Sequence, residues 1–173
     1  MVNVYDNVLN FELVNEFYKY AIDTNYKLGF QDSNAIEKRN FFNIHSLLSM
    51  DQIRDSNILE SLDKINEYKT NKNNLIFSKS VINLIMFTDS NYIHVHPNQH
   101  VILIYLNPEW VPDWAGETVF FDDNCQEVVK SITPKPGRAV YFDGSTPHSI
   151  RCQNQIAPQF RFTLSIFFNL WKN

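Results

Sequence analysis

The stretch that decides the fold reads ITPKPGRAVYFDGSTPHSI and covers residues 132–150. It contains a turn signal with two prolines and a glycine, then an apolar run at residues 139–142, then a second turn signal of Asp, Gly and Ser. Proline and glycine interrupt regular elements and favour tight turns, whereas β-branched and aromatic residues favour strands. The stretch therefore predicts short strands that are joined by turns.

The same pattern extends from residue 75 to the apolar run near the end of the chain. We expect strands at residues 75–78, 82–88, 92–96, 101–106, 117–121, 127–132, 139–142, 149–152 and 160–168. Many short strands without alternating helices indicate antiparallel sheets that form a sandwich or a barrel.

The chain before residue 75 shows helical rather than strand periodicity. Apolar residues recur at intervals of three and four in residues 9–21 and again in residues 53–65. This spacing predicts two amphipathic helices, with Asn7 and Ser49 as their N-caps. The two apolar stripes are expected to pack on the strands.

The length of 173 residues suits one well-buried core and is short for two. We therefore expect a single domain over residues 1–173 that is mainly β. Residues 1–74 form a helical N-terminal layer in this prediction, and residues 75–173 form the β core.

Composition excludes several classes of protein. Hydrophobic residues make up 44% of the chain and charged residues 20%, which is typical of a globular protein. The net charge of -4, without a basic cluster, disfavours nucleic acid as a partner. The start of the chain lacks the pattern of a secretory signal, and no apolar run approaches the ~20 residues of a membrane helix. We therefore expect a cytoplasmic protein without a membrane partner, in which Cys125 and Cys152 are free thiols. The sequence leaves the oligomeric state open.

Two histidines stand two residues apart in Tyr92-Ile93-His94-Val95-His96. In a strand, alternate side chains share one face, so both imidazoles would point the same way. A third histidine, His148, follows the turn signals of the quoted stretch. Imidazole binds iron, zinc, copper and nickel, so His94, His96 and His148 are candidate metal ligands at the mouth of the barrel. The other two histidines are expected to be structural.

An iron(II) oxygenase site commonly combines two histidines with one carboxylate. The nearest candidate carboxylate is Glu117, because Gly116 before it lets the backbone turn into the next strand. Glu117 is therefore a candidate ligand. The alternative is that it binds only backbone groups or an arginine.

Arg161 lies in the apolar run Phe160-Arg161-Phe162-Thr163-Leu164-Ser165-Ile166-Phe167-Phe168. In a strand, Arg161, Thr163 and Ser165 share one face. A buried guanidinium needs an anion, and its planar fork suits a carboxylate, to which the Thr163 hydroxyl would add a donor. The alternative is that Arg161 pairs with an acidic side chain of the protein.

Several short motifs resemble the prolyl 4-hydroxylase-like 2-oxoglutarate and iron(II)-dependent oxygenases. They cover roughly residues 80 to 170 and are His94-Val95-His96, Ile104-Tyr105-Leu106-Asn107-Pro108-Glu109-Trp110, Trp114-Ala115-Gly116-Glu117-Thr118-Val119-Phe120-Phe121, Pro136-Gly137-Arg138, Pro147-His148 and Arg161-Phe162-Thr163. The resemblance implies a double-stranded β-helix, which is the jelly-roll or cupin-like fold, with iron at its open end.

By this resemblance, His148 is the distal histidine ligand, and Arg161 binds the far carboxylate of 2-oxoglutarate. Thr163 and Tyr105 are implied to contact the same carboxylate, with Tyr92 as the alternative to Tyr105. No catalytic residue is expected beyond the metal site.

The chain departs from the family at its first motif, which is usually His-x-Asp. Here it is His94-Val95-His96. Either three histidines hold the metal, or Glu117 supplies the carboxylate as a fourth ligand. A third reading takes His96-Pro97-Asn98 as the motif, although Asn98 is a poor ligand. We favour His94, His96 and His148, with Glu117 nearby.

The resemblance implies an iron(II)- and 2-oxoglutarate-dependent dioxygenase that hydroxylates a C–H bond, with ascorbate as a further candidate cofactor. The substrate is a small molecule, a peptide or a protein, and peptidyl proline is the family's best-known target. Two alternatives remain at this point. One is a cupin-type metal enzyme that does not use 2-oxoglutarate, and the other is a non-catalytic jelly-roll module that binds a metal or ligand.

Overall fold

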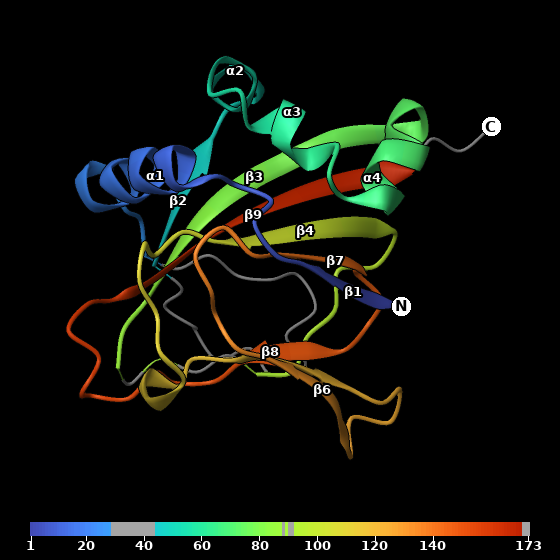
Figure 1. Ribbon diagram of the computed structural model, residues 1–173. Coiled ribbons are helices and arrows are strands. Elements are labelled where there is room, and N and C mark those ends of the chain that lie inside the picture. The colour runs from blue at the N-terminus through green and yellow to red at the C-terminus, as the bar shows by residue number, and fades with distance from the viewer. Residues whose placement is uncertain (29–43, 88, 90–91, 171–173) are drawn as a thin grey trace.

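Two antiparallel sheets form the centre of the protein in the computed structural model (Figure 1), which describes residues 1–28, 44–87, 89 and 92–170. The major sheet has the strand order β1 (Val2–Tyr5), β7 (Ala139–Asp143), β4 (Gln99–Tyr105), β9 (Arg161–Leu170), β3 (Leu75–Ile85) and β2 (Ile44–Leu48). The minor sheet has the order β6 (Val128–Ile132), β5 (Thr118–Phe121) and β8 (His148–Ile150).

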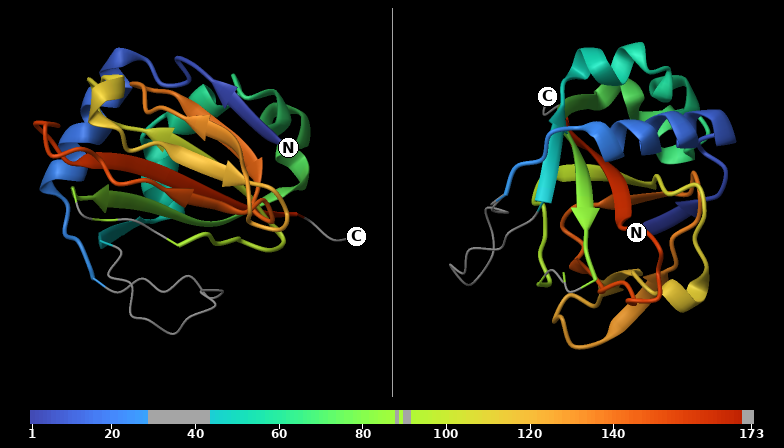
Figure 2. Two further views of the ribbon diagram at one scale, coloured as in Figure 1. Left: turned by 90° about the horizontal axis from the view of Figure 1, so that it is seen from below. Right: turned by 90° about the vertical axis from the view of Figure 1, so that its left-hand side faces the viewer.

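The helices cover one face of the major sheet, and the minor sheet lies on the opposite side (Figures 1 and 2). They are α1 (Phe11–Asp23), α2 (Met50–Asp55), α3 (Ile58–Leu62) and α4 (Asn66–Asn71), followed by the 3₁₀ helix η1 (Lys72–Asn74). A second 3₁₀ helix, η2 (Pro112–Trp114), precedes β5. The major sheet is therefore the middle of three layers.

Strand β4 shows how the major sheet is buried on both faces. Its alternate residues Ile102 and Ile104 belong to the core under the helices. Val101, Leu103 and Tyr105 belong to the core between the two sheets. Because side chains alternate along a strand, a continuous apolar run fits a strand that is buried on both sides. The predicted mainly β fold with N-terminal helices is thus confirmed.

The N-terminal region differs from the prediction in containing two strands as well as helices. β1 pairs with β7 and β2 pairs with β3, so both extend the major sheet at its edges. The prediction missed them because each is short, with four residues in β1 and five in β2, and lies among segments with helical periodicity. The described part of residues 1–74 therefore contributes two strands to the sheet in addition to the helices that cover it.

The helix ends also differ in part from the prediction. Ser49 caps α2 as expected, in a capping box with Gln52. The cap of α1 is Asn10, which accepts a hydrogen bond from Leu13 N at 2.9 Å, whereas Asn7 has a left-handed φ of 57° before the helix. The second predicted helix is broken, because Asn57 adopts a φ of 58° between α2 and α3.

The predicted strands after residue 75 are mostly present, with two differences. β3 is one long strand where two were expected, and it continues through the expected gap at residues 79–81, with a register shift just before it, between Phe77 and Lys79. Residues 92–96 do not form a regular strand. His94 instead makes an isolated antiparallel bridge with His148.

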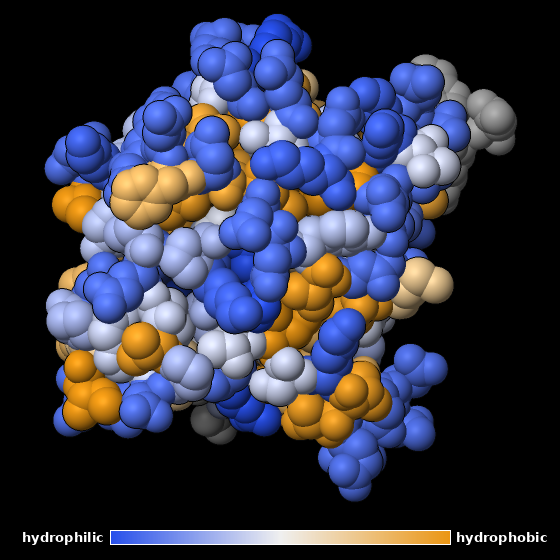
Figure 3. All heavy atoms as spheres, viewed as in Figure 1, coloured by the Kyte–Doolittle hydropathy of each residue, from blue (hydrophilic) through white to orange (hydrophobic). Residues whose placement is uncertain are grey.

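The face shown in Figure 3 is largely hydrophilic, with apolar side chains scattered over it. Among the exposed apolar residues, Val128 and Val129 lie on the edge strand β6. No helix of the described residues is long and apolar enough to cross a membrane. Cys125 and Cys152 are free thiols, as predicted, and both are exposed.

Candidate metal and cosubstrate site

Three histidines converge between the two sheets. Their ligand nitrogens all lie within 4.8 Å of one another, and His96 and His148 are buried while His94 is half-buried. His94 and His148 stand directly opposite each other, because His94 N donates to His148 O at 3.0 Å and His148 N donates to His94 O at 3.1 Å. Paired residues of an antiparallel bridge point to the same face. The bridge therefore brings two imidazoles together from segments that are far apart in the sequence.

His96 is held by the turn between β7 and β8. Its N–H donates to Gly144 O at 2.6 Å, and Gly144 N donates to Gln99 O at 2.7 Å. A Cβ atom on Gly144 would lie 2.3 Å from His96 O and 2.9 Å from His96 Cβ. Only glycine fits this close approach of two backbones. Gly144 thus determines where the third imidazole lies.

The hydrogen bonds of His94 and His148 determine which ring nitrogen faces the cluster. His94 Nδ1 lies 2.9 Å from Tyr92 O, and His148 Nδ1 lies 2.8 Å from Thr146 O. A carbonyl oxygen only accepts, so Nδ1 donates in each of these contacts, and Nε2 is the candidate ligand atom of each ring. This arrangement is typical of histidines that bind a metal.

Aromatic rings surround the three imidazoles. The ring centroids of Phe142 and His148 are 4.8 Å apart, those of Phe120 and His148 are 5.8 Å apart, and those of Phe167 and His96 are 4.9 Å apart. Because these phenylalanines belong to the core between the sheets, they shield one side of the cluster from water. Access to a bound ion is left on the side of the half-buried His94.

Arg161 lies deeper between the sheets and is fully buried, with 0% exposure. Its Nη2 donates to Thr118 Oγ1 at 2.9 Å. Among the described residues, its Nε and Nη1 have no hydrogen-bond partner, nor has the buried Thr163 Oγ1. Burial lowers the pKa of the guanidinium, and the charge of Glu117 acts in the opposite direction. Native proteins rarely leave buried donors unpaired, so these atoms are candidates to hold an anion.

Tyr105 forms the wall beside Arg161. The guanidinium carbon lies 5.1 Å from the centre of its ring, and its hydroxyl oxygen lies 2.8 Å from Thr118 Oγ1. The side chain is 1% exposed, and burial raises the pKa of the phenol. Tyr105 is therefore a neutral hydroxyl beside the buried guanidinium of Arg161.

Strand β5 relates the histidines to Arg161. Phe120 pairs with His148, whereas Thr118, two residues earlier, bonds to Arg161. Two residues of a strand span about 7 Å. The side chains around Arg161 and the histidine cluster are therefore separated along the strand by about 7 Å, roughly the length of a short dicarboxylic acid.

Glu117 does not join the histidine cluster. Among the described residues, the group whose ligand atoms lie within 4.8 Å consists of the three histidines. Glu117 is half-buried and directly precedes Thr118, whose side chain faces Arg161. Because side chains alternate along an extended chain, consecutive residues turn to opposite faces. Its influence on Arg161 is through its charge.

The two tyrosines considered for the cosubstrate lie in different places. Tyr105 is at the guanidinium, as described above. Tyr92 is 49% exposed, and its backbone carbonyl contacts the His94 ring. Of the two, only Tyr105 lies within the buried pocket.

The sequence analysis missed three residues that hold the site together. Thr118 links Arg161 to Tyr105, and Gly144 places His96. Gln153 is buried and accepts a hydrogen bond from Arg161 N at 2.8 Å. Thr118 was detectable, because it shares the β5 face with Phe120, but Gln153 lies in an irregular loop without a pattern.

Known proteins resemble this chain in sequence and in fold. The family model described as "2OG-Fe(II) oxygenase superfamily" matches residues 83–169, which include the three histidines and Arg161. No curated protein matches the sequence.

Solved structures resemble the whole fold. One is a prolyl hydroxylase from Trichoplax adhaerens in complex with a peptide fragment of hypoxia inducible factor, which is 16% identical with a TM-score of 0.70, covering 97% of this chain and 83% of that one. A second is a prolyl-4-hydroxylase from Pseudomonas putida, which is 15% identical with a TM-score of 0.66, covering 98% and 92%. A third is HygX from Streptomyces hygroscopicus with nickel and 2-oxoglutarate bound, which is 8% identical with a TM-score of 0.67, covering 98% and 82%.

These similarities confirm the predicted double-stranded β-helix fold. The family match extends over half of the chain and contains every residue of the buried pocket described above. The protein belongs to the 2OG-Fe(II) oxygenase superfamily.

Proposed function

We propose that His94, His96 and His148 bind the catalytic iron(II), and that Arg161, Thr163 and Tyr105 bind the far carboxylate of 2-oxoglutarate. The observation that carries this assignment is the buried guanidinium of Arg161. Its Nε and Nη1, together with Thr163 Oγ1, have no partner among the described residues. A guanidinium donates two hydrogen bonds along one edge to a carboxylate, so a carboxylate of 2-oxoglutarate could accept from Arg161 and from the neighbouring Thr163 hydroxyl.

The chemistry of the donor set fits iron(II). Imidazole is a common ligand of iron, and the candidate ligand nitrogens of the three histidines lie within 4.8 Å of one another. When iron is bound, it supplies the redox chemistry by which 2-oxoglutarate and dioxygen yield succinate and carbon dioxide while a substrate C–H becomes C–OH. The three histidines differ from the set of two histidines and one carboxylate in having no negative charge.

The residues of this chain act by binding, orienting and excluding water. Arg161 and Thr163 anchor one end of the cosubstrate, so that its 2-oxo acid end lies toward the histidines. Tyr105 keeps its hydroxyl proton at neutral pH, because burial raises its pKa above the ordinary value of 10.0. Phe120, Phe142 and Phe167 keep the metal side of the pocket apolar. This shielding limits side reactions with water.

We further propose that the substrate is a peptide or protein, with peptidyl proline as the first candidate. The support is the similarity of fold to prolyl hydroxylases, one of which is described in complex with a peptide. A cytoplasmic location is also proposed, because two exposed free thiols suit a reducing compartment.

The test is succinate formation from 2-oxoglutarate with iron(II), with and without ascorbate, across a panel of proline-containing peptides. We expect turnover that rises with a suitable peptide and is lost in His148→Ala. Arg161→Met is expected to bind iron(II) normally and to lose 2-oxoglutarate binding. Absence of turnover by the fully iron-loaded protein would contradict the assignment.

The same experiment separates the alternative functions. A cupin-type metal enzyme that does not use 2-oxoglutarate would keep its activity in Arg161→Met. A non-catalytic module would bind the metal without forming succinate. The buried unpaired guanidinium favours the oxygenase, because neither alternative requires a second charged group in the pocket.

A further inference from the structure

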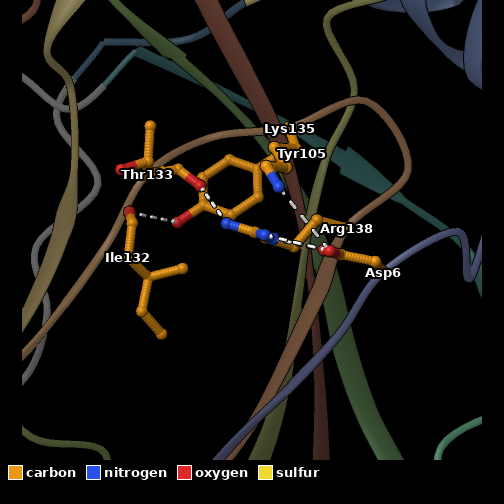
Figure 4. Close-up of polar contacts among 6 residues, drawn as sticks. All are labelled: Asp6, Tyr105, Ile132, Thr133, Lys135 and Arg138. Atoms are coloured by element: carbon orange, nitrogen blue, oxygen red, sulfur yellow. Dashed lines mark hydrogen bonds and ion pairs between the residues drawn. The ribbon is translucent and has the colours of Figure 1, made fainter. Parts of the chain in front are cut away.

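A polar network links Tyr105 to Arg138 and Asp6 through the end of β6 (Figure 4). The Tyr105 hydroxyl donates to Ile132 O at 3.2 Å in addition to its contact with Thr118. The next carbonyl along the chain, Thr133 O, accepts a hydrogen bond from Arg138 Nη1 at 2.8 Å. Two consecutive carbonyls at the end of β6 therefore contact the tyrosine and the arginine.

Arg138 also holds Tyr105 through the backbone. Tyr105 N donates to Arg138 O at 3.0 Å, and Gly137 N donates to Tyr105 O at 3.1 Å. The same arginine residue thus pairs with the main chain of Tyr105 and fixes the segment that its hydroxyl contacts. Both ends of the tyrosine depend on Arg138.

The guanidinium of Arg138 is itself oriented by the N-terminal strand. Its Nε donates to Asp6 Oδ1 at 2.6 Å, and its Nη2 donates to Asp6 Oδ2 at 3.1 Å. Asp6 directly follows β1, and the Arg138 side chain is only 13% exposed. A two-point pair of this kind fixes the plane of the guanidinium, which an ammonium group could not do.

We propose that Arg138 is a positioning residue for 2-oxoglutarate, which it affects through Tyr105, and that Asp6 places the N-terminal strand in the same network. The proposal rests on the proposed function, because it takes Tyr105 as a contact of the cosubstrate carboxylate. The charge of Arg138 is engaged by Asp6 and by Thr133 O, so Arg138 does not touch the cosubstrate. Its effect is on the place of the Tyr105 hydroxyl.

A double-mutant cycle tests whether Arg138 acts through Tyr105. The variants are Arg138→Gln, Tyr105→Phe and the double variant, each loaded with iron(II) without oxygen and titrated with 2-oxoglutarate by calorimetry. Loss of one well-placed hydrogen bond predicts that Arg138→Gln weakens 2-oxoglutarate binding about fivefold. The same change should have no further effect in the Tyr105→Phe background, because the contact through which it acts is already gone.

Steady-state kinetics provide a second measurement. We expect Arg138→Gln to raise the KM for 2-oxoglutarate by the same factor and to leave kcat unchanged, because only the binding of the cosubstrate is altered. Equal weakening in the presence and absence of the Tyr105 hydroxyl would overturn the proposal. So would unchanged affinity in a folded Arg138→Gln protein.

Asp6→Asn provides a milder variant if Arg138→Gln does not fold. It keeps Arg138 and removes the charge that orients it, so we expect a weakening of about twofold. The matched control is Lys135→Gln. Lys135 Nζ lies 3.8 Å from Asp6 Oδ2, with no contact to Thr133 or to the Tyr105 hydroxyl among its described contacts.

Lys135→Gln is expected to leave 2-oxoglutarate affinity unchanged. A loss of affinity in Lys135→Gln equal to that in Asp6→Asn would show a general effect of surface charge and overturn the proposal. If the unaltered iron-loaded protein binds no 2-oxoglutarate, the proposed function itself fails. If instead the unaltered protein and Arg138→Gln bind 2-oxoglutarate equally well, the proposed role of Arg138 fails and the proposed function stands.

Discussion

His96 is the residue at which this chain departs from the expected His-x-Asp motif. Its ring packs with those of His94 and His148, at centroid distances of 5.0 and 5.2 Å. A site made of three neutral imidazoles carries one more positive charge when loaded than a site with a carboxylate. Carboxylate ligands are harder donors and contribute charge attraction to a divalent cation. The identity of residue 96 should therefore control metal affinity.

We predict that His96→Asp binds iron(II) about tenfold more tightly than the unaltered protein. The measurement is an anaerobic titration of iron(II) against a competing chelator. His96→Asn is the matched control, because it has nearly the same shape as aspartate without the charge. If the Asn and Asp variants bind iron(II) equally well, charge is not the cause.

Gly144 supports His96 by the close approach of two backbones. Gly144→Ala would place a Cβ atom 2.3 Å from His96 O and 2.8 Å from Gln99 O. Both are backbone carbonyls, so neither can move unless the main chain shifts with it. We predict that iron(II) affinity falls at least about tenfold, because the third imidazole is displaced. The neighbouring exposed residue gives the control, Ser145→Ala, which should leave the affinity unchanged. Normal metal binding by Gly144→Ala would show that His96 is not a ligand or that the turn adapts.

At the scale of elements, the segment from residue 50 to residue 74 shows how local signals and packing compete. Apolar residues at helical spacing bury one face of this segment, including Ile53, Ile58 and Leu62. The continuous helix that the spacing predicts is interrupted at Asn57, a residue type that tolerates a left-handed conformation. The segment thus covers the curved major sheet with short helices instead of one straight helix.

The capping box of α2 is the best-defined local signal in this segment. Ser49 Oγ accepts from Gln52 N at 3.2 Å, and Gln52 Oε1 accepts from Ser49 N at 2.9 Å. We predict that Ser49→Ala lowers the free energy of unfolding by about 1 kcal/mol. Chemical denaturation measures this change. Arg54→Ala, which removes an exposed ion pair with Asp51, is the control and should change stability by less than about 0.5 kcal/mol.

At the scale of the whole molecule, the three layers explain how one small domain holds a buried polar pocket. The helices cover the outer face of the major sheet, and the minor sheet closes the inner face. The candidate site lies between the sheets, where Arg161 is buried and Phe120, Phe142 and Phe167 belong to the apolar core. The N-terminal strand completes the major sheet at the edge formed by β7.

The attachment of the N-terminal strand predicts a dependence of stability on pH. The hydrogen bond from Arg138 lowers the pKa of Asp6 below its ordinary value of 3.8, more than burial raises it. A carboxyl whose pKa is lower in the folded state stabilises the fold above its unfolded pKa, and this contribution is lost as the pH falls through the folded pKa. The window therefore lies at and below about pH 4.

We predict that Asp6→Asn is less stable than the unaltered protein near neutral pH, and that the difference shrinks as the pH falls through this window. Because Asp6 is half-exposed, the difference is small and decreases with added salt. Urea unfolding at a series of pH values measures it. A difference that is constant down to pH 3 would contradict the ionic origin of the contact.

The fold class and most of the site could be predicted from local sequence patterns. Turn residues punctuate the strands, the alternation in Phe160–Phe168 identified a polar face around Arg161, and the histidines stood out by their spacing. Such features are encoded in neighbouring residues, so the chain reveals them before it folds. The predicted strand at residues 92–96 is wrong, because a strand also needs a partner strand. The alternation of its residues is a local feature, but its pairing is limited to the bridge between His94 and His148.

The sequence by itself determined which residue types the site contains: three imidazoles, one arginine in an apolar strand, and a β core to hold them. Only the tertiary structure decided which groups meet. Arg161 and Thr118 are 43 residues apart, and Tyr105 is 27 residues from the carbonyl of Ile132. The tertiary structure also decided that Glu117 lies outside the histidine cluster. Strand β5 directs Thr118 to Arg161, so the preceding Glu117 turns to the other face. These contacts depend on the register and packing of strands from distant parts of the chain, which no local pattern specifies.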